Sequence, residues 1–171
     1  MQEELRRNRD TLVCMGAGVM LFGAWSGIKA LILCLFQQDR LLRMLGEEAA
    51  ENPKLYLLAT YIALAIFFAV DLLLRVYVGR AARAEGFGRR KRGYGYIIAA
   101  ALLALGSFLS MAGSVAFLQD ASQYYDSWLD VAVSFAVDAT SAVVLAEVAI
   151  AGIRVKKLTR GGEKEDAGHA A

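Results

Sequence analysis

Histidine, proline and cysteine are scarce in this 171-residue sequence, which contains one histidine, one proline and two cysteines. His169 lies in the polar C-terminal tail, so a histidine-based metal or haem site and a Ser-His-Asp catalytic set are both excluded. Cys14 and Cys34 fall in one predicted helix, about 30 Å apart at 1.5 Å per residue, which excludes a disulfide between them. With no phosphate-binding loop followed by Gly-Lys-Ser/Thr either, we expect no enzyme, no metal and no cofactor.

Apolar residues make up 57% of the chain, above the roughly 45–50% of a typical soluble domain. They are gathered into four blocks, each long enough to supply the roughly 20 apolar residues that a membrane-spanning helix requires. These blocks span about residues 11–36, 55–78, 94–118 and 129–153. The sequence therefore predicts an all-α polytopic membrane protein, a four-transmembrane-helix up-down bundle within residues 1–160. The polar tail, residues 161–171, is predicted to be disordered.

Local signals set the ends of the second predicted helix. Asn52 and Pro53 together predict a helix start, since asparagine is a favoured N-cap and proline suits the first helical position. The helix is expected to continue beyond its apolar block to Glu85. It is expected to stop at Gly86, because glycine readily adopts the left-handed conformation that ends many helices.

The distribution of lysine and arginine predicts the orientation in the membrane. The N-terminal arm, the second connection and the C-terminal tail carry 14 basic residues, whereas the first and third connections carry three. Cytoplasmic segments of membrane proteins are enriched in basic residues. We therefore expect a multi-pass protein of the plasma membrane with both termini and the second connection in the cytoplasm.

Two sequence patterns concern helix packing. Phe68–Asp71 recurs as Phe135–Asp138. A chance match of four residues is the favoured interpretation, and the alternative is two parallel helical hairpins related by an axis along the membrane normal. Gly23 and Gly27 form a small-xxx-small pattern that permits close approach of helices. This pattern serves either packing within the bundle or homodimerisation, and the first is the favoured interpretation.

Apart from Asp130, which is expected to belong to the capping box at the start of the fourth helix, five charged residues fall inside the apolar blocks. A charge at this depth costs about 2.5–3.5 kcal/mol on insertion scales and usually has a partner. The five residues are Lys29, Asp71, Arg75, Asp138 and Glu147. Helix rise places Lys29 at the depth of Asp138, and Arg75 at the depth of Glu147 and one turn from Asp71. The simplest wiring pairs Lys29 with Asp138, and Arg75 with Glu147 or Asp71. One carboxylate remains over, so this set is either a buried clasp between helices or a proton or cation site.

Four consecutive bases, Arg89, Arg90, Lys91 and Arg92, occupy the second connection. Basic residues beside a membrane helix attract anionic lipids, by about 1 kcal/mol per residue near the surface. We interpret this loop first as an orienting signal and second as a contact for anionic lipid. The stretch is too short, and too close to the bilayer, to indicate nucleic-acid binding.

Two functions remain open at this point. In size and number of predicted helices the chain resembles the small multidrug transporters, but these are shorter, and the glutamate of their first helix is replaced by Lys29. The resemblance therefore supplies no function. The favoured hypothesis is a non-enzymatic accessory or interaction subunit that binds a membrane-protein partner. The alternative is a small homo-oligomeric transporter or channel in which a buried carboxylate exchanges a proton or cation.

Overall fold

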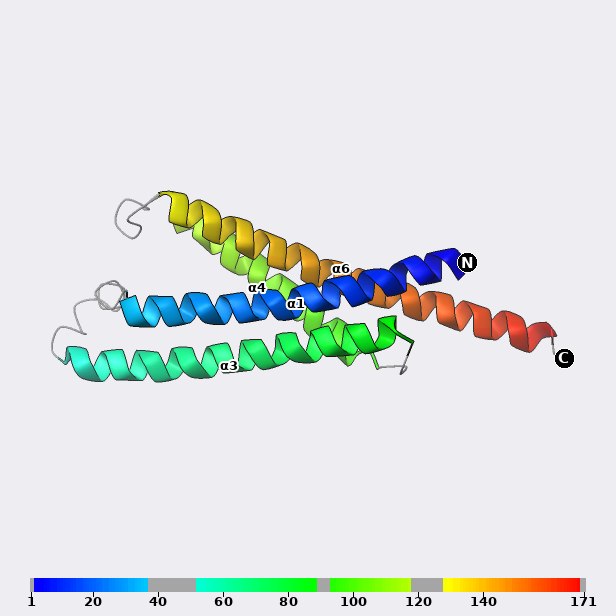
Figure 1. Ribbon diagram of the computed structural model, residues 1–171, viewed down its shortest axis with the longest axis horizontal. Helices are drawn as coiled ribbons and strands as arrows, with labels where there is room; N and C mark the ends of the chain where they lie inside the picture. The colour runs from blue at the N-terminus through cyan, green and yellow to red at the C-terminus, as the bar shows by residue number, and fades with distance from the viewer. Residues whose placement is uncertain (1, 37–51, 89–92, 118–127, 170–171) are drawn as a thin grey trace.

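The computed structural model describes residues 2–36, 52–88, 93–117 and 128–169, and every element in these ranges is an α-helix or a short turn. The four helices are α1 (Gln2–Phe36), α3 (Pro53–Gly86), α4 (Gly95–Phe117) and α6 (Trp128–His169), shown in Figure 1. The all-α prediction is confirmed. Each predicted apolar block lies almost wholly within one helix.

Three of the helices extend well beyond their apolar blocks. α1 begins at Gln2 rather than near residue 11, and α3 continues to Gly86. α6 continues to His169, through most of the tail for which the sequence predicts disorder. Once a helix is nucleated, each further residue adds a hydrogen bond at modest cost. Hydropathy reports where the apolar side chains end, and it does not mark the end of the helical backbone.

The ends of α3 follow the sequence signals in part. Asn52 is the N-cap and Pro53 opens the helix, as predicted, but the Asn52 side chain makes no capping hydrogen bond. Its carbonyl oxygen instead accepts hydrogen bonds from the following turn. At the other end Gly86 is the last helical residue, and the left-handed residue is Gly88, with φ of 68°. The prediction of a left-handed Gly86 was therefore wrong by two residues.

The helices form two antiparallel pairs, α1 with α3 and α4 with α6, and α1 also packs along α6 (Figure 1). The start of α1, the end of α3, the start of α4 and the end of α6 lie toward one end of the molecule (Figure 1). The two pairs cross near this end and diverge toward the other. The buried apolar side chains are concentrated where the two pairs cross. The largest of them are Tyr96, Leu12, Leu145, Val19, Val78 and Val148.

Glycines bring α1 and α3 into close contact. A Cβ atom built on Gly79 would lie 2.5 Å from the carbonyl oxygen of Gly16, and one on Gly86 would lie 2.7 Å from the carbonyl oxygen of Arg9. Gly23, seven residues after Gly16, faces Arg75. Gly27, its partner in the predicted small-residue pattern, has no atom within 4 Å of a built Cβ. The contact between α1 and α3 therefore uses glycines spaced seven residues apart. Seven residues make about two helical turns, so these glycines lie on the same face of their helix.

Three helices are long and apolar enough to cross a membrane, at Gln2–Ile28, Lys54–Gly86 and Phe135–Gly161. Among the residues searched, α4 contributes a shorter apolar stretch, Gly95–Leu109. In α3 none of the most apolar 18-residue window is buried within the molecule. This long apolar surface of α3 is thus directed outward.

Candidate functional site

A buried arginine ties α3 to α6. Arg75 Nε donates to Asp71 Oδ2 at 2.8 Å, within α3, and Arg75 Nη1 donates to the Ser141 hydroxyl of α6 at 2.7 Å. The Arg75 and Asp71 side chains are 8% and 19% exposed. We call Asp71, Arg75 and Ser141 the Arg75 cluster. The cluster gives the buried guanidinium one charged and one neutral acceptor, for two of its five N–H donors.

The cluster follows from local sequence on two helices. Asp71 and Arg75 are four residues apart, so they share one face of α3. Gly23 of α1 leaves room for the arginine stem, because a Cβ atom there would lie 3.0 Å from Arg75 Cδ. The Arg75–Asp71 pair is one of the two pairings that the sequence predicted, and it is confirmed. Ser141 was not predicted, since a serine in an apolar helix gives no signal of its partner.

A second buried ion pair joins α3 to α6 nearer the termini. Lys156 Nζ lies 3.2 Å from Glu85 Oε1, and the two side chains are 13% and 9% exposed. The same ammonium lies 5.0 Å from the centre of the Tyr94 ring and 5.9 Å from that of Tyr96. Both distances suit attraction between a cation and an aromatic face. These four residues, the Glu85 cluster, connect three segments of the chain at one point.

Two polar atoms in the Glu85 cluster have no hydrogen-bond partner among the residues that the structure describes: Glu85 Oε2 and the Tyr96 hydroxyl. Tyr96 lies next to the Glu85 carboxylate. Gly152 of α6 makes room for the hydroxyl, because a Cβ atom there would lie 2.7 Å from it. The cluster therefore keeps one donor and one acceptor close together beside a fixed ion pair.

Sequence reasoning missed the Glu85 cluster because each of its charged members is an ordinary residue for the end of a membrane helix. Glu85 falls at the predicted end of the second apolar helix, and Lys156 belongs to the basic C-terminal segment that indicates orientation. Neither position therefore predicts a buried partner. Only the three-dimensional structure shows that Glu85 and Lys156 meet, because no spacing within one helix encodes a contact between two helices.

The remaining predicted residues lie apart from both clusters. Glu147 is exposed on α6 and does not join Arg75, although its predicted depth is the same. Its neighbours Leu145 and Val148 are buried, so Glu147 occupies the outward face. Asp138 is half-buried and makes no ion pair with a described side chain. The Lys29 side chain lies outside the described residues, so its pairing with Asp138 stays a prediction.

Two further predictions concern the basic loop and metals. The loop Arg89–Arg92 lies outside the described residues. In the part of the chain that the structure does describe, no three histidine, cysteine or acidic side chains are grouped as metal ligands would be. No family model, curated protein or solved structure matches the chain. Its function has to be inferred from its own residues and their geometry.

Proposed function

We propose that this chain is a multi-pass membrane protein that acts as a non-enzymatic accessory or interaction subunit. The observation that carries the proposal is the outward-facing apolar surface of α3. Phe67, Leu73 and Leu55 are each about two-thirds exposed, at 66%, 69% and 65%. Water would disfavour such a surface by roughly 25 cal/mol per Å² of apolar area, whereas lipid or a partner's helix would cover it at no such cost.

The buried charges support an architectural role over a transport role. Arg75 is satisfied by Asp71 and Ser141, and Lys156 by Glu85 and two tyrosine rings. Charges that are paired in this way hold helices in register. A carboxylate that exchanges a proton or cation must instead release its partner during each cycle. Both clusters link α3 to α6 and so add polar contacts to the packing of α1 along α6 that joins the two hairpins.

We place both termini and the turn between α3 and α4 in the cytoplasm, at the plasma membrane. The described helix ends that border these segments lie toward one end of the molecule (Figure 1). The N-terminal arm, the second connection and the C-terminal tail carry 14 of the 19 lysine and arginine residues. Basic residues are retained on the cytoplasmic side. The loop Arg89–Arg92 would then face anionic lipid headgroups.

Reporter fusions test this topology. Green fluorescent protein fused after residue 171 is expected to fluoresce, and alkaline phosphatase at the same site is expected to be inactive, because that site is cytoplasmic. Fusions after residue 46 should give the reverse pattern. A C-terminal alkaline phosphatase with full activity would show that the orientation is inverted. Activity of both reporters at both sites would contradict a single topology.

The accessory role is tested by isolating the native complex. The full chain is extracted from its native membrane in mild detergent, and the intact mass of the particle is measured by native mass spectrometry. We expect a stoichiometric complex with a different membrane protein. A variant with Phe67→Ser and Leu73→Ser on the exposed face of α3 should retain its helicity and lose the partner. A particle containing copies of this chain alone would reject the accessory role.

One observation favours the alternative, a small oligomeric transporter or channel. Asp138 is half-buried in α6, three residues from Ser141, and has no ion-pair partner among the described side chains. An ionisable side chain inside a membrane-spanning segment can mark a pathway for protons or ions. In proteoliposomes, proton-coupled flux that is abolished by Asp138→Asn and kept by Glu147→Gln would establish this alternative.

A further inference from the structure

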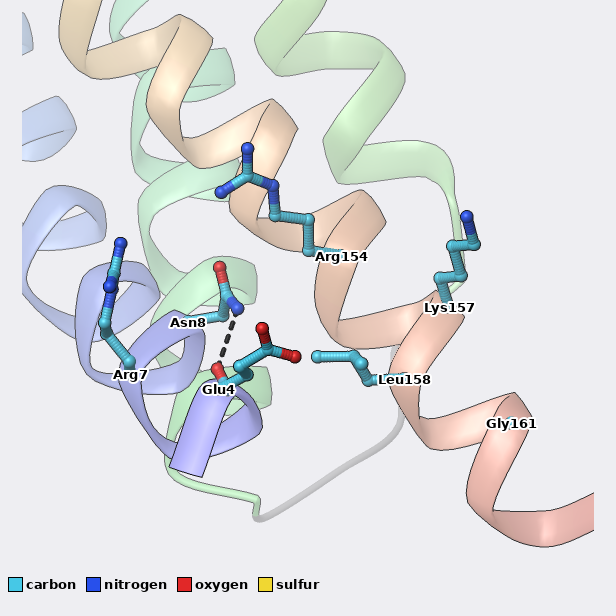
Figure 2. A pocket seen from close by; sticks show the side chains of 7 residues that line it. All are labelled: Glu4, Arg7, Asn8, Arg154, Lys157, Leu158 and Gly161. Carbon is cyan, nitrogen blue, oxygen red and sulfur yellow. Dashed lines mark hydrogen bonds between the residues drawn. The ribbon is translucent and has the colours of Figure 1, made fainter. Parts of the chain in front are cut away.

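A groove of about 440 Å³ lies between the first turns of α1 and the C-terminal half of α6. Figure 2 shows the α1 side chains opposite those of α6 across it. The groove is lined by Glu4, Arg7, Asn8, Arg154, Lys157, Leu158 and Gly161. It lies at the end of the molecule that carries both termini (Figure 1). Neither buried cluster shares a residue with it, so it is a separate site.

The charge of the groove is not balanced from within. Arg7, Arg154 and Lys157 line the groove together with a single described carboxylate, that of Glu4. None of these cations forms an ion pair with a described side chain. Lys156, the neighbour of Lys157, is by contrast paired with Glu85. Among the described residues, the cations that line the groove outnumber the carboxylates, and this excess of positive charge attracts an anionic ligand.

The hydrogen-bond acceptors of the groove limit which kinds of ligand can bind in it. Asn8 Nδ2 donates to the Glu4 carbonyl oxygen at 2.7 Å, the dashed line in Figure 2. Its amide oxygen is thereby left to accept a hydrogen bond from a ligand. The Glu4 carboxylate is also an acceptor, and it would repel a second phosphate. Acceptors beside cations suit a ligand that combines one phosphate with hydroxyl groups.

We propose that this groove binds a polyol phosphate, a phosphate group esterified to a hydroxyl-bearing unit such as glycerol. The two guanidinium groups would hold the phosphate oxygens, for which their planar pairs of donors are well matched. Asn8 and Glu4 would accept hydrogen bonds from the hydroxyls. The volume is within the roughly 300–1,000 Å³ of small-ligand sites.

Two sources can supply this chemistry, the headgroup of an anionic glycerophospholipid and a soluble polyol phosphate. The lipid source rests on the proposed membrane insertion, and half-buried Leu158 supplies an apolar wall beside the cations. The soluble source requires no membrane. Reporter fusions decide insertion independently, so failure of the membrane proposal and failure of the groove proposal are distinguishable.

The test measures binding to the full chain in detergent by native mass spectrometry. The probes are dioctanoyl phosphatidylglycerol, dioctanoyl phosphatidylcholine and glycerol 1-phosphate. We expect phosphatidylglycerol to bind at least about tenfold more tightly than phosphatidylcholine. Arg7→Gln and Arg154→Gln should each weaken it about tenfold, the loss expected for one charge-assisted contact. Arg6→Gln is the matched control, since Arg6 carries the same charge one position away and does not line the groove.

Each outcome decides the proposal or its source. Tight binding of phosphatidylglycerol with little binding of glycerol 1-phosphate identifies a lipid site, and equal binding of both identifies a soluble ligand. Equal losses in Arg6→Gln and Arg7→Gln would indicate diffuse attraction and overturn the proposal, as would binding of none of the probes. Arg7 and Arg154 are exposed, so single variants should fold, and unchanged circular dichroism confirms it.

Discussion

Replacing Arg75 by methionine is expected to lower the free energy of unfolding by about 3 kcal/mol, the largest effect of any single charge removal in the described part of the chain. The substitution keeps most of the side-chain volume and removes the guanidinium. Asp71 then loses a charged partner at 2.8 Å, and the buried Ser141 hydroxyl loses the donor that it accepts from at 2.7 Å. Titration with SDS in mixed micelles, followed by proteolysis of the unfolded fraction, measures the change.

Two further variants isolate the cause of that loss. Arg80→Met removes the same charge from an exposed position of α3, and it should change stability by less than about 0.5 kcal/mol. Adding Asp71→Leu to Arg75→Met should recover part of the loss, because no uncompensated carboxylate remains. If the double variant loses the sum of the two single losses, then Asp71 and Arg75 do not stabilise the protein as a pair.

The second large effect is expected at the closest approach of α1 and α3. Gly79→Ala should cost about 2 kcal/mol, as overpacking of a close contact does. The added methyl group would lie 2.5 Å from the Gly16 carbonyl oxygen and 2.6 Å from Met20 Cγ. The methionine can rotate away, but the carbonyl belongs to the helix backbone, so the two helices must separate. Thermal unfolding in detergent reports the loss.

Gly106→Ala is the matched control for this contact. Gly106 is exposed on α4, and no atom lies within 4 Å of a Cβ built there. The alanine should leave stability unchanged or raise it by less than about 1 kcal/mol, through its better helix propensity. Equal effects of the two substitutions would mean that helix propensity, rather than contact between α1 and α3, determines the result.

The sequence was sufficient for features that depend on one helix at a time. The apolar blocks predicted all four helices, because each block is far longer than a typical β-strand and long enough for a membrane-spanning helix. The Asp71–Arg75 pair was also accessible, because a spacing of four residues places two side chains on one helical face. Helix ends were less accessible: α6 runs to His169, and its polar residues carry no hydropathy signal.

Features that depend on the rotation of one helix against another were not accessible. Glu147 matched Arg75 in depth, but depth leaves the azimuth undetermined, and α6 directs this carboxylate outward. Glu85 contacts Lys156 because the rotation of α3 and α6 about their own axes directs these two side chains toward each other. A one-dimensional charge pattern gives position along the membrane normal, whereas partner choice requires the angle about each helix axis.

Because apolar side chains are buried mainly toward one end, the two ends of the molecule differ in stiffness. Leu12 near the start of α1, Val78 and Glu85 near the end of α3 and Tyr96 near the start of α4 are all buried, and the helices diverge toward the opposite end (Figure 1). Regions with few buried contacts open at low free energy. In the proposed orientation, the protein is stiff in the cytoplasmic leaflet and compliant in the outer one. Lipid chain length and lateral pressure in the outer leaflet would then set how far apart the two hairpins stand.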